Sequence, residues 1–169
     1  MIISNTIVRR EAANKDRYYE NGGKSVHKGI ELSYKQKFST QFAGTLSASY
    51  SKSNYVKDLQ YSDNEMANAP RKKANLRLFY TPSDTFTLMA EIQYIGSYYM
   101  DENNKHSYDG YTIGNIKVNY DVTKHLKCYA KVNNITDKAY AEKANFAYGS
   151  ARYTPALPRT IYAGIKFIF

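Results

Sequence analysis

Arginine, lysine and tyrosine side chains in three polar segments are the groups of this sequence best suited to bind a ligand. The segments read RREAANKDRYYENGGK (residues 9–24), APRKK (residues 69–73) and FAYGSARYTPALPR (residues 146–159). Cationic groups pair with anionic oxygens, and aromatic rings stack on flat conjugated groups or on cations. We therefore expect contacts to an anionic, aromatic ligand from Arg17, Tyr18, Tyr19, Arg71, Lys72, Lys73, Tyr148, Arg152 and Tyr153.

Patterns typical of catalysis or metal binding are not found in the sequence. It has no P-loop, no G-x-S-x-G turn and no H-E-x-x-H pair. Cys128 is the only cysteine, so neither a disulfide nor a cysteine-based zinc site can form within the chain. Haem or copper would need histidines or methionines close together, but these are scattered, at His27, His106, His125, Met66 and Met100. The sequence therefore predicts a protein that is not an enzyme and that holds no cofactor or metal.

The composition favours β-structure and an anionic partner. The 169 residues include 18 Tyr and 7 Phe, and the formal net charge is +9. No apolar run approaches the roughly 18 residues that a membrane helix needs. A transmembrane β-barrel stays compatible with the mean hydropathy of -0.63, because its strands are only half apolar. The possible anionic partners are nucleic acid, lipid headgroups and an acidic small ligand.

Alternation of apolar and polar residues recurs along the chain and predicts antiparallel strands. In TFTLMAEIQYI, for example, Leu88, Ala90 and Ile92 share one face, whereas Thr87 and Glu91 share the other. Equivalent patterns occur near residues 1–10, 25–38, 41–51, 73–81, 86–99, 115–120, 126–133 and 159–169. We therefore expect an all-β fold of about eight antiparallel strands.

The predicted connections alternate strictly between short and long. Tight turns fall near Phe38–Thr40, Pro82–Asp84 and Asp121–Lys124, where Pro, Ser and Asp suit turn geometry. Long polar connections fall near residues 11–24, 57–71, 101–109 and 134–158. Outer-membrane barrels have this layout, with short periplasmic turns and longer extracellular loops. An antiparallel transmembrane β-barrel would also explain why the chain ends on an uncovered apolar strand, since lipid would cover it.

Four segments resemble the C-terminal part of the barrel of TonB-dependent outer-membrane receptors. They are ENGGKSVHKGIELSY (residues 20–34), NAPRKKANLRLFYTPSD (residues 68–84), KVNNITDKAYAE (residues 131–142) and PALPRTIYAGIKFIF (residues 155–169). Each segment is a weak signal alone, but together they keep the family's order and spacing. The chain is therefore expected to be one domain, residues 1–169, that forms the last part of a barrel of about 22 strands with a plugged lumen.

The resemblance implies energy-coupled uptake of a metal chelate, most often a ferric siderophore, across the bacterial outer membrane. It implies contact with outer-membrane lipid and lipopolysaccharide, and recognition of the terminal strand by the barrel-assembly machinery through Ile165, Phe167 and Phe169. The sequence contains no segment that resembles the family's plug or TonB box. Coupling to the TonB complex is therefore expected only through a plug region that this sequence lacks.

Three alternatives to chelate binding or to the receptor assignment follow from the same residues. The basic loops could be solvated segments that bind lipopolysaccharide phosphates. The chain could close as a self-contained eight-stranded outer-membrane barrel with a structural or adhesive role, since eight strands can close. A soluble β-domain that binds single-stranded nucleic acid would use the same lysines and tyrosines, but it would explain neither the sorted loops nor the terminal Phe169. We therefore expect no nucleic-acid partner.

Overall fold

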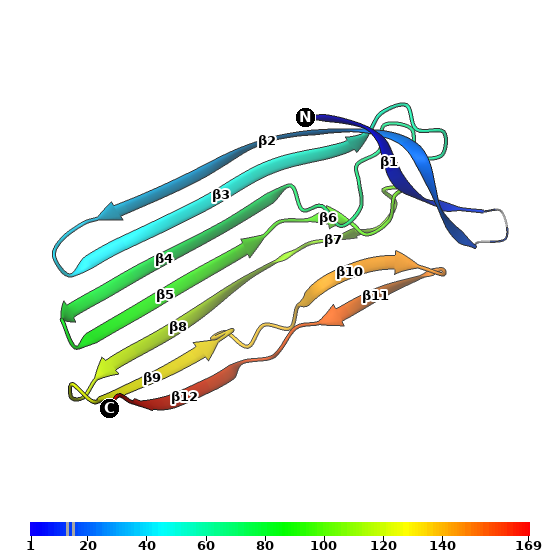
Figure 1. Ribbon diagram of the computed structural model, residues 1–169. Helices are drawn as coiled ribbons and strands as arrows, with labels where there is room; N and C mark the ends of the chain where they lie inside the picture. Colours follow the sequence, from blue (N-terminus) through cyan, green and yellow to red (C-terminus); the bar gives the residue numbers. More distant parts are fainter. Residues whose placement is uncertain (13, 15) are drawn as a thin grey trace.

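The computed structural model describes residues 1–12, 14 and 16–169, except for the side chains of Asn5, Thr6 and Arg17. Eight strands form one antiparallel sheet in the order β1-β2-β3-β4-β5-β8-β9-β12 (Figure 1). They are β1 (Ile2–Glu11), β2 (Arg17–Lys37), β3 (Phe42–Tyr55), β4 (Lys72–Ser83), β5 (Phe86–Ile95), β8 (Tyr111–Asp121), β9 (Leu126–Asn133) and β12 (Thr160–Phe167). The predicted all-β class and the predicted number of main strands are confirmed.

Short and long connections lie at opposite ends of this sheet (Figure 1). Residues 38–41, 84–85 and 122–125 make the short turns, within one or two residues of their predicted positions. We call the other end, which carries residues 12–16, 56–71, 96–110 and 134–159, the long-loop end. Two small hairpins form there, β6 (Tyr98–Tyr99) with β7 (Ser107–Tyr108) and β10 (Ala141–Ala147) with β11 (Ser150–Pro155). The described residues contain no helix long and apolar enough to cross a membrane.

The first long connection is much shorter than predicted. Residues 11–24 were expected to be a polar loop, but β1 continues to Glu11 and pairs there with Arg17, the first residue of β2. Strand β2 has 21 residues, about twice the 9–11 that cross a membrane. The outer part of this hairpin lies beyond the lipid-facing part of the sheet and buries few apolar side chains, Val8 among them, so it lacks a regular apolar alternation. Hydrophobic periodicity therefore could not reveal it.

The two faces of the sheet have opposite chemistry, and the apolar one is the more exposed. The apolar face carries Ile30, Leu32, Leu46, Leu78, Ile92, Val118, Ile165 and Phe167. The exposed fraction is 76% for Ile30 and 65% for Ile165, whereas Glu91 and Asn115 on the polar face are 7% and 6% exposed. A water-soluble sandwich would bury the apolar side. This arrangement suits a wall with lipid on one side and a polar lumen on the other.

A hydrogen-bond network on the polar face joins β4, β5 and β8. The carboxylate of Glu91 accepts hydrogen bonds from Asn75 (2.9 Å), Arg77 (2.7 Å), Gln93 (2.9 Å) and Asn115 (2.9 Å). Direct cross-strand pairing of Arg77 with Glu91 and of Glu91 with Asn115 places these groups side by side. The network satisfies a nearly buried carboxylate, as burial of a charge requires.

The same network fixes the start of the β9–β10 connection. The backbone N–H of Asn134 donates to Oδ1 of Asn115 at 2.9 Å. The Asn134 side chain, which is fully buried, bonds the backbone N–H and C=O of Lys138. Asn134 has a φ of 51°, which asparagine tolerates better than most residues. The Asn-Ile-Thr-Asp segment therefore anchors the last long loop to the strand wall.

Tyr129 covers a glycine on the polar face between β9 and β12. Gly164 lies directly opposite Tyr129, and a Cβ at Gly164 would lie 2.4 Å from the tyrosine ring. An aromatic ring that covers a strand glycine on the neighbouring strand compensates for the missing side chain. This pair is thus part of the packing of the last two strands of the sheet.

The sheet is open. Strands β1 and β12 lie at its opposite edges, and within the described part of the chain no ladder joins them (Figure 1). The predicted alternative of a self-contained eight-stranded barrel is therefore not the arrangement in this structure. Unpaired edge groups cannot remain exposed in lipid, because each N–H or C=O without a partner there costs several kcal/mol.

Candidate functional site

Four segments meet at the long-loop end: the β1–β2 hairpin, the connection 56–71, the segment 96–110 and the β10–β11 hairpin. Hydrogen bonds tie each of them to a neighbour. Tyr108 and Tyr98 of the small β6–β7 hairpin bond the backbone of β10, where their hydroxyls accept from the N–H of Ala141 and of Ala144, both at 2.9 Å. The four segments therefore form one packed layer rather than separate loops.

An ion pair holds the connection 56–71 to the first hairpin. Arg10 of β1 bonds the carboxylate of Asp58, and both residues are buried. Asp58 Oδ1 also accepts the backbone N–H groups of Gln60 and Tyr61, both at 2.9 Å. The Tyr61 hydroxyl donates to the carbonyl of Arg9 at 2.8 Å. Buried charges of opposite sign thus fix the loop on the hairpin.

These contacts shift the pKa of several groups. Burial acts to raise the pKa of Asp58, but hydrogen bonds from Arg10 and from the N–H groups of Tyr61 and Gln60 outweigh it and leave the pKa below its ordinary 3.8. The Asp58 hydrogen bond raises the pKa of Arg10. Burial, then the nearby negative charge of Glu102, raises the pKa of Tyr61. At neutral pH the ion pair is therefore fully charged and the tyrosine keeps its proton.

A second group of contacts joins the connection 56–71 to the segment 96–110. Glu102 accepts the N–H of Ala67 at 2.9 Å, and Asn104 accepts the N–H of Glu65 at 2.8 Å. Glu65 also pairs with Arg71, whose Nε donates at 2.7 Å, and this hydrogen bond lowers the pKa of Glu65 below its ordinary value of 4.5. The guanidinium of Arg71 is thereby engaged within the protein.

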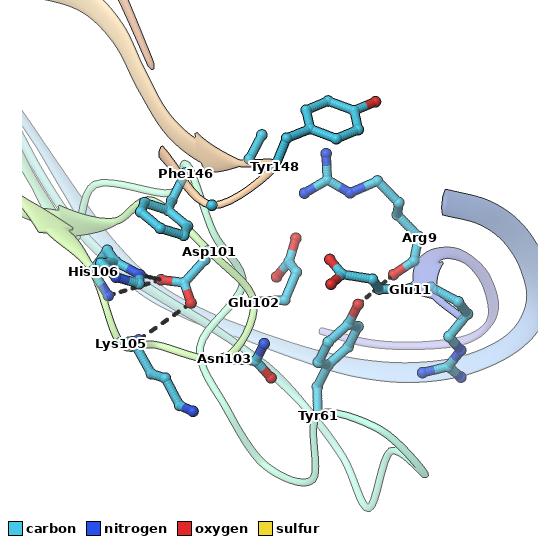
Figure 2. Close-up of a pocket in the computed structure, with 13 residues that line it drawn as sticks. Arg9, Glu11, Tyr61, Asp101, Glu102, Asn103, Lys105, His106, Phe146 and Tyr148 are labelled. Carbon is cyan, nitrogen blue, oxygen red and sulfur yellow. Dashed lines mark hydrogen bonds and ion pairs between the residues drawn. The ribbon is translucent and has the colours of Figure 1, made fainter. Parts of the chain in front are cut away.

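A cavity of about 250 Å³ opens where these segments meet (Figure 2). Figure 2 shows the guanidinium of Arg9 and the carboxylates of Glu11 and Glu102 directed toward its centre. The ring of His106 stacks on Phe146 with 3.6 Å between centroids and 5° between planes. The cavity is lined by Arg9, Arg10, Glu11, Tyr61, Asp101, Glu102, Asn103, Lys105, His106, Phe146, Ala147, Tyr148 and Gly149.

The cavity could bind a polar ligand that carries both donors and acceptors. Arg9 and Lys105 supply positive charge, Glu11 and Glu102 supply negative charge, and Tyr148 supplies an aromatic surface. Binding pockets for drug-sized molecules usually have about 300–1,000 Å³. A cavity of about 250 Å³ can therefore enclose part of such a ligand, and neighbouring parts of a barrel would have to cover the rest.

The structure distributes the ligand residues expected from the sequence over several places. Tyr148 lines the cavity, and the guanidinium of Arg152 lies over its ring, 4.8 Å from the centroid. Tyr153 is exposed on β11, and its ring lies beside that of Tyr108. Tyr18 and Tyr19 are exposed on β2 opposite Arg10 and Arg9. The side chain of Arg17 lies outside the described part of the structure.

The three basic residues 71–73 do not act as one patch. Arg71 is bonded to Glu65, as described above. Lys72 and Lys73 follow each other in β4, so their side chains point to opposite faces of the sheet, Lys72 to the apolar face and Lys73 to the polar face. One ligand in the lumen could not contact both. The sequence alone already implied this separation, because the period of a strand is two residues.

Several cavity residues were missed by sequence reasoning. Arg9 and Arg10 lay at the end of the first predicted strand and Glu11 in the predicted loop after it, none of them among the expected ligand contacts, and the segment Asp101–His106 carried no recognised pattern. The run DENNKH was the only signal, since it is dense in polar groups within a short connection. His106 stays far from His27, which bonds Ser25 and Ser53, and from His125 at a short turn. In the described residues, no group of three or more His, Cys, Asp or Glu side chains could hold a metal ion.

An antiparallel sheet with one lipid-compatible face, one polar face and loops sorted by length defines the wall of an outer-membrane β-barrel. The chain belongs to the TonB-dependent receptors, because the family model described as "TonB dependent receptor-like, beta-barrel" matches residues 2–135. Members of this family reside in the bacterial outer membrane and are receptors rather than enzymes. The resemblance read from the sequence is thus confirmed.

Individual relatives match the chain over part of their length. The ferrichrome outer membrane transporter/phage receptor of Escherichia coli K12 is 29% identical over 136 residues, which are 76% of this chain and 18% of that protein. The ferric yersiniabactin uptake receptor FyuA of Yersinia pestis shares the fold with a TM-score of 0.80 at 19% identity, over 90% of this chain and 25% of that chain. The copper transporter OprC shares the fold with a TM-score of 0.81 at 19% identity, over 99% of this chain and 27% of that chain. The chain therefore spans about a fifth to a quarter of the length of the relatives it matches.

Proposed function

We propose that this chain forms part of the barrel of a TonB-dependent receptor that takes up a metal chelate of the ferric siderophore class, with the long-loop end facing the cell exterior. The cavity between the β1–β2 hairpin and the β10–β11 hairpin is the observation that carries the proposal. It combines cationic, anionic and aromatic groups at the end of the barrel where long loops lie outside the cell. Such a mixture suits a polar chelate with conjugated groups.

Relatives support a chelate as the substrate. The curated matches include receptors named for ferrichrome and ferrioxamine B. Copper is the alternative substrate, because OprC, which has a similar fold, is named as a copper transporter. The two methionines considered as copper ligands are used in packing here: Met100 is 4% exposed, and Met66 packs against Val8, Tyr55 and Tyr61. This use of the thioethers favours a chelate over a bare copper ion.

The open edges of the sheet support the larger architecture. The unpaired groups along β1 and β12 would be satisfied by further strands of a barrel of about 22 strands. Contact with the TonB complex would then occur through a plug domain inside that barrel. Ile165 and Phe167 are exposed on the apolar side of β12, and Phe169 is exposed just after the end of this strand; the barrel-assembly machinery would read these residues during insertion. Lipid and lipopolysaccharide would surround the wall.

Binding measurements on the receptor that contains this chain test the proposal. Ferric hydroxamate, ferric catecholate, haem and copper ions would be titrated against the wild-type receptor and against an Arg9→Ala, Tyr148→Ala variant. We expect a ferric chelate to bind, and the double variant to lose about 30-fold in affinity, since each of the two lost charged or stacking contacts is worth about 1 kcal/mol. Lys124→Ala at a short turn is the matched control. Binding of copper alone, or equal chelate affinity in all three proteins, would overturn the proposal.

A further inference from the structure

Four lysines lie close together on the polar face of β8, β9 and β12, away from the cavity at the long-loop end. Lys117 of β8 and Lys131 of β9 are direct cross-strand partners, and so are Lys127 of β9 and Lys166 of β12. We call these four residues the lumen lysine cluster. Like charges directly opposite each other in a sheet are destabilising. Such pairs therefore favour an anion bound between them.

Acidic groups on this part of the polar face neutralise only part of the cluster. Asp121 forms an ion pair with Lys127. The carboxylate of Glu91 on β5 is already bonded by Arg77 and by three side-chain amides, as described above. Within the described residues, no carboxylate lies at ion-pair distance from the other three lysines of the cluster. The cluster therefore keeps a net positive charge.

An aromatic ring lies in the middle of the cluster. Tyr129 alternates with Lys127 and Lys131 along β9, so all three side chains point to the polar face. The ring of Tyr129 lies against Gly164, yet the residue is 45% exposed. One side of the ring is thus covered by the neighbouring strand, and the other side is open to the lumen. Tyr162, the cross-strand partner of Lys131, adds a second exposed ring.

The size and chemistry of this surface suit a small anionic chelate. Lys127 and Lys131 are four residues apart in one strand, which corresponds to about 13 Å, and three neighbouring strands span about 10 Å. Cationic groups at the margin pair with anionic oxygens, and a flat ring at the centre stacks on flat conjugated groups. A ligand that carries both kinds of group can use the whole surface at once.

The cluster lies toward the short-turn end of the sheet. Strand β8 ends at Asp121 and β9 begins at Leu126, so Lys127 is next to the turn of residues 122–125. Figure 1 shows this turn at the end of the sheet opposite the β1–β2 and β10–β11 hairpins, which border the cavity. A ligand that leaves the cavity through the lumen toward the short-turn end therefore passes this face.

We propose that the lumen lysine cluster and Tyr129 form a second binding site for the transported chelate, on its way from the cavity toward the short-turn end. The ligand class is an anionic chelate with flat aromatic groups, such as a ferric complex of catecholates. A ferric complex of hydroxamates is neutral and would gain little from the lysines. This inference rests on the proposed function, and it narrows the substrate from chelates in general to negatively charged ones.

Uptake and binding, measured separately on the whole receptor in cells, test the second site. Radiolabelled ferric catecholate and ferric hydroxamate would be supplied to cells with the wild-type receptor or with a Lys117→Gln, Lys131→Gln, Lys166→Gln variant. We expect this variant to take up ferric catecholate about tenfold more slowly at saturation, since each exposed lysine–anion contact contributes about a factor of two. Its affinity for the chelate at the cell surface should equal that of wild type, because the cavity is unchanged.

Three further variants separate the site from a general effect of charge. Replacement of the same three lysines by arginine keeps the charge and should keep uptake near the wild-type rate. Lys35→Gln, Lys37→Gln, Lys124→Gln removes the same charge at the short-turn end outside the cluster and should behave like wild type. Tyr129→Leu keeps a side chain over Gly164 without the ring, and we expect it to slow uptake about threefold. Heat-modifiable migration verifies that each variant is folded.

The outcomes distinguish this inference from the proposed function. Equal uptake by the cluster variant and its control, or uptake of ferric hydroxamate alone by wild type, would overturn the second site and leave the proposed function intact. A lower urea midpoint of unfolding in the cluster variant than in its control would show that the lysines hold a plug domain, which would also overturn the site. Binding of no ferric chelate by wild type would overturn the proposed function, and this inference with it.

Discussion

At the scale of single residues, Glu91 connects more of the structure than any other carboxylate of the polar face described above. Its two oxygens accept four side-chain hydrogen bonds, and Asn115 extends the same network to Asn134. A buried acceptor with several donors is costly to remove, because each donor left without a partner loses its hydrogen bond inside the protein. The network therefore holds β4, β5, β8 and the last long loop in one register.

Removal of this carboxylate should weaken the wall. We expect Glu91→Ala to lower the free energy of unfolding by about 1–3 kcal/mol, since Arg77, Asn75 and Asn115 would lose their common acceptor. Glu31→Ala is the control, because Glu31 is an exposed carboxylate of β2. Urea unfolding in detergent or lipid vesicles, followed by tyrosine fluorescence, gives both values. An equal loss in the two variants would show that the network adds nothing.

Single residues also show what the sequence could predict about the site. The opposite directions of Lys72 and Lys73 follow from the strand period and needed no structure. The bond between Arg71 and Glu65 could not be predicted, because it depends on how an irregular connection folds back on itself. The same holds for Arg10, which finds Asp58 across 48 residues of sequence. The sequence indicated which residue types could form a site, but not the partners that these residues have in the structure.

At the scale of elements, the long connections act as one layer because buried ion pairs and hydrogen bonds join them. Asp58 and Glu65 have a lowered pKa in the folded protein. A carboxylate with a depressed folded pKa contributes stability that is present above its unfolded pKa and lost as the pH falls through its folded pKa. The ordinary values are 3.8 for Asp58 and 4.5 for Glu65.

The layer should therefore open in acid. We expect residues 56–71 to become sensitive to hydrogen exchange as the pH is lowered from about 4.5 toward 2, while the layer stays closed at pH 6–8. An Asp58→Asn, Glu65→Gln variant should already exchange faster at pH 7 and show a flatter pH profile. The idea fails if the variant and wild type keep the same profile over this range. Exchange in residues 42–50 of β3 serves as the internal reference.

The last two strands offer a test of packing. A methyl group at Gly164 would displace the ring of Tyr129, so we expect Gly164→Ala to cost on the order of 1 kcal/mol in wild type and almost nothing in a Tyr129→Ala background. Unfolding of the four proteins of this double-mutant cycle gives the coupling free energy. Additive effects would mean that the ring does not protect the glycine.

The strands that face lipid were predictable, whereas the hairpins that pack against other loops at the long-loop end were not. The sequence predicts strands β3, β4, β5 and β8 through residues such as Leu46, Leu78 and Ile92, because lipid requires an apolar residue at every second position. The outer part of the β1–β2 hairpin and the β10–β11 hairpin carry no such requirement, and β11 is exposed along its whole length. Hydrogen bonds of the Tyr98 and Tyr108 hydroxyls to the β10 backbone hold the β10–β11 hairpin in place, and no periodicity encodes them.

At the scale of the whole molecule, the sheet separates two environments. Its apolar face is exposed in the structure because lipid is its natural cover, and its polar face lines a lumen. At the depth of the acyl chains, charges are therefore tolerated on the polar face only. At the bilayer midplane a lysine that faces lipid costs about 2–4 kcal/mol.

Two neighbouring positions of β3 test this separation. Leu46 lies halfway between Phe42 and Tyr50 on the apolar face, and Ser47 is exposed on the polar face. We expect Leu46→Lys to lower the unfolding free energy by about 2–4 kcal/mol, and Ser47→Lys to change it by about 0.5 kcal/mol or less. Reversible unfolding in lipid vesicles measures both. A comparable penalty at Ser47 would contradict the assignment of the two faces.

The strict alternation of the two faces also limits how such a wall can evolve. One inserted or deleted residue near the start of β3 would turn Ser47, Ser49 and Ser51 toward the acyl chains, and Leu46 and Tyr50 toward the lumen. Strand lengths can therefore change only by even steps, whereas the long loops can gain or lose any number of residues. Natural variants of this protein should show odd-length indels in the segments 56–71, 96–110 and 134–159, and almost never inside the strands.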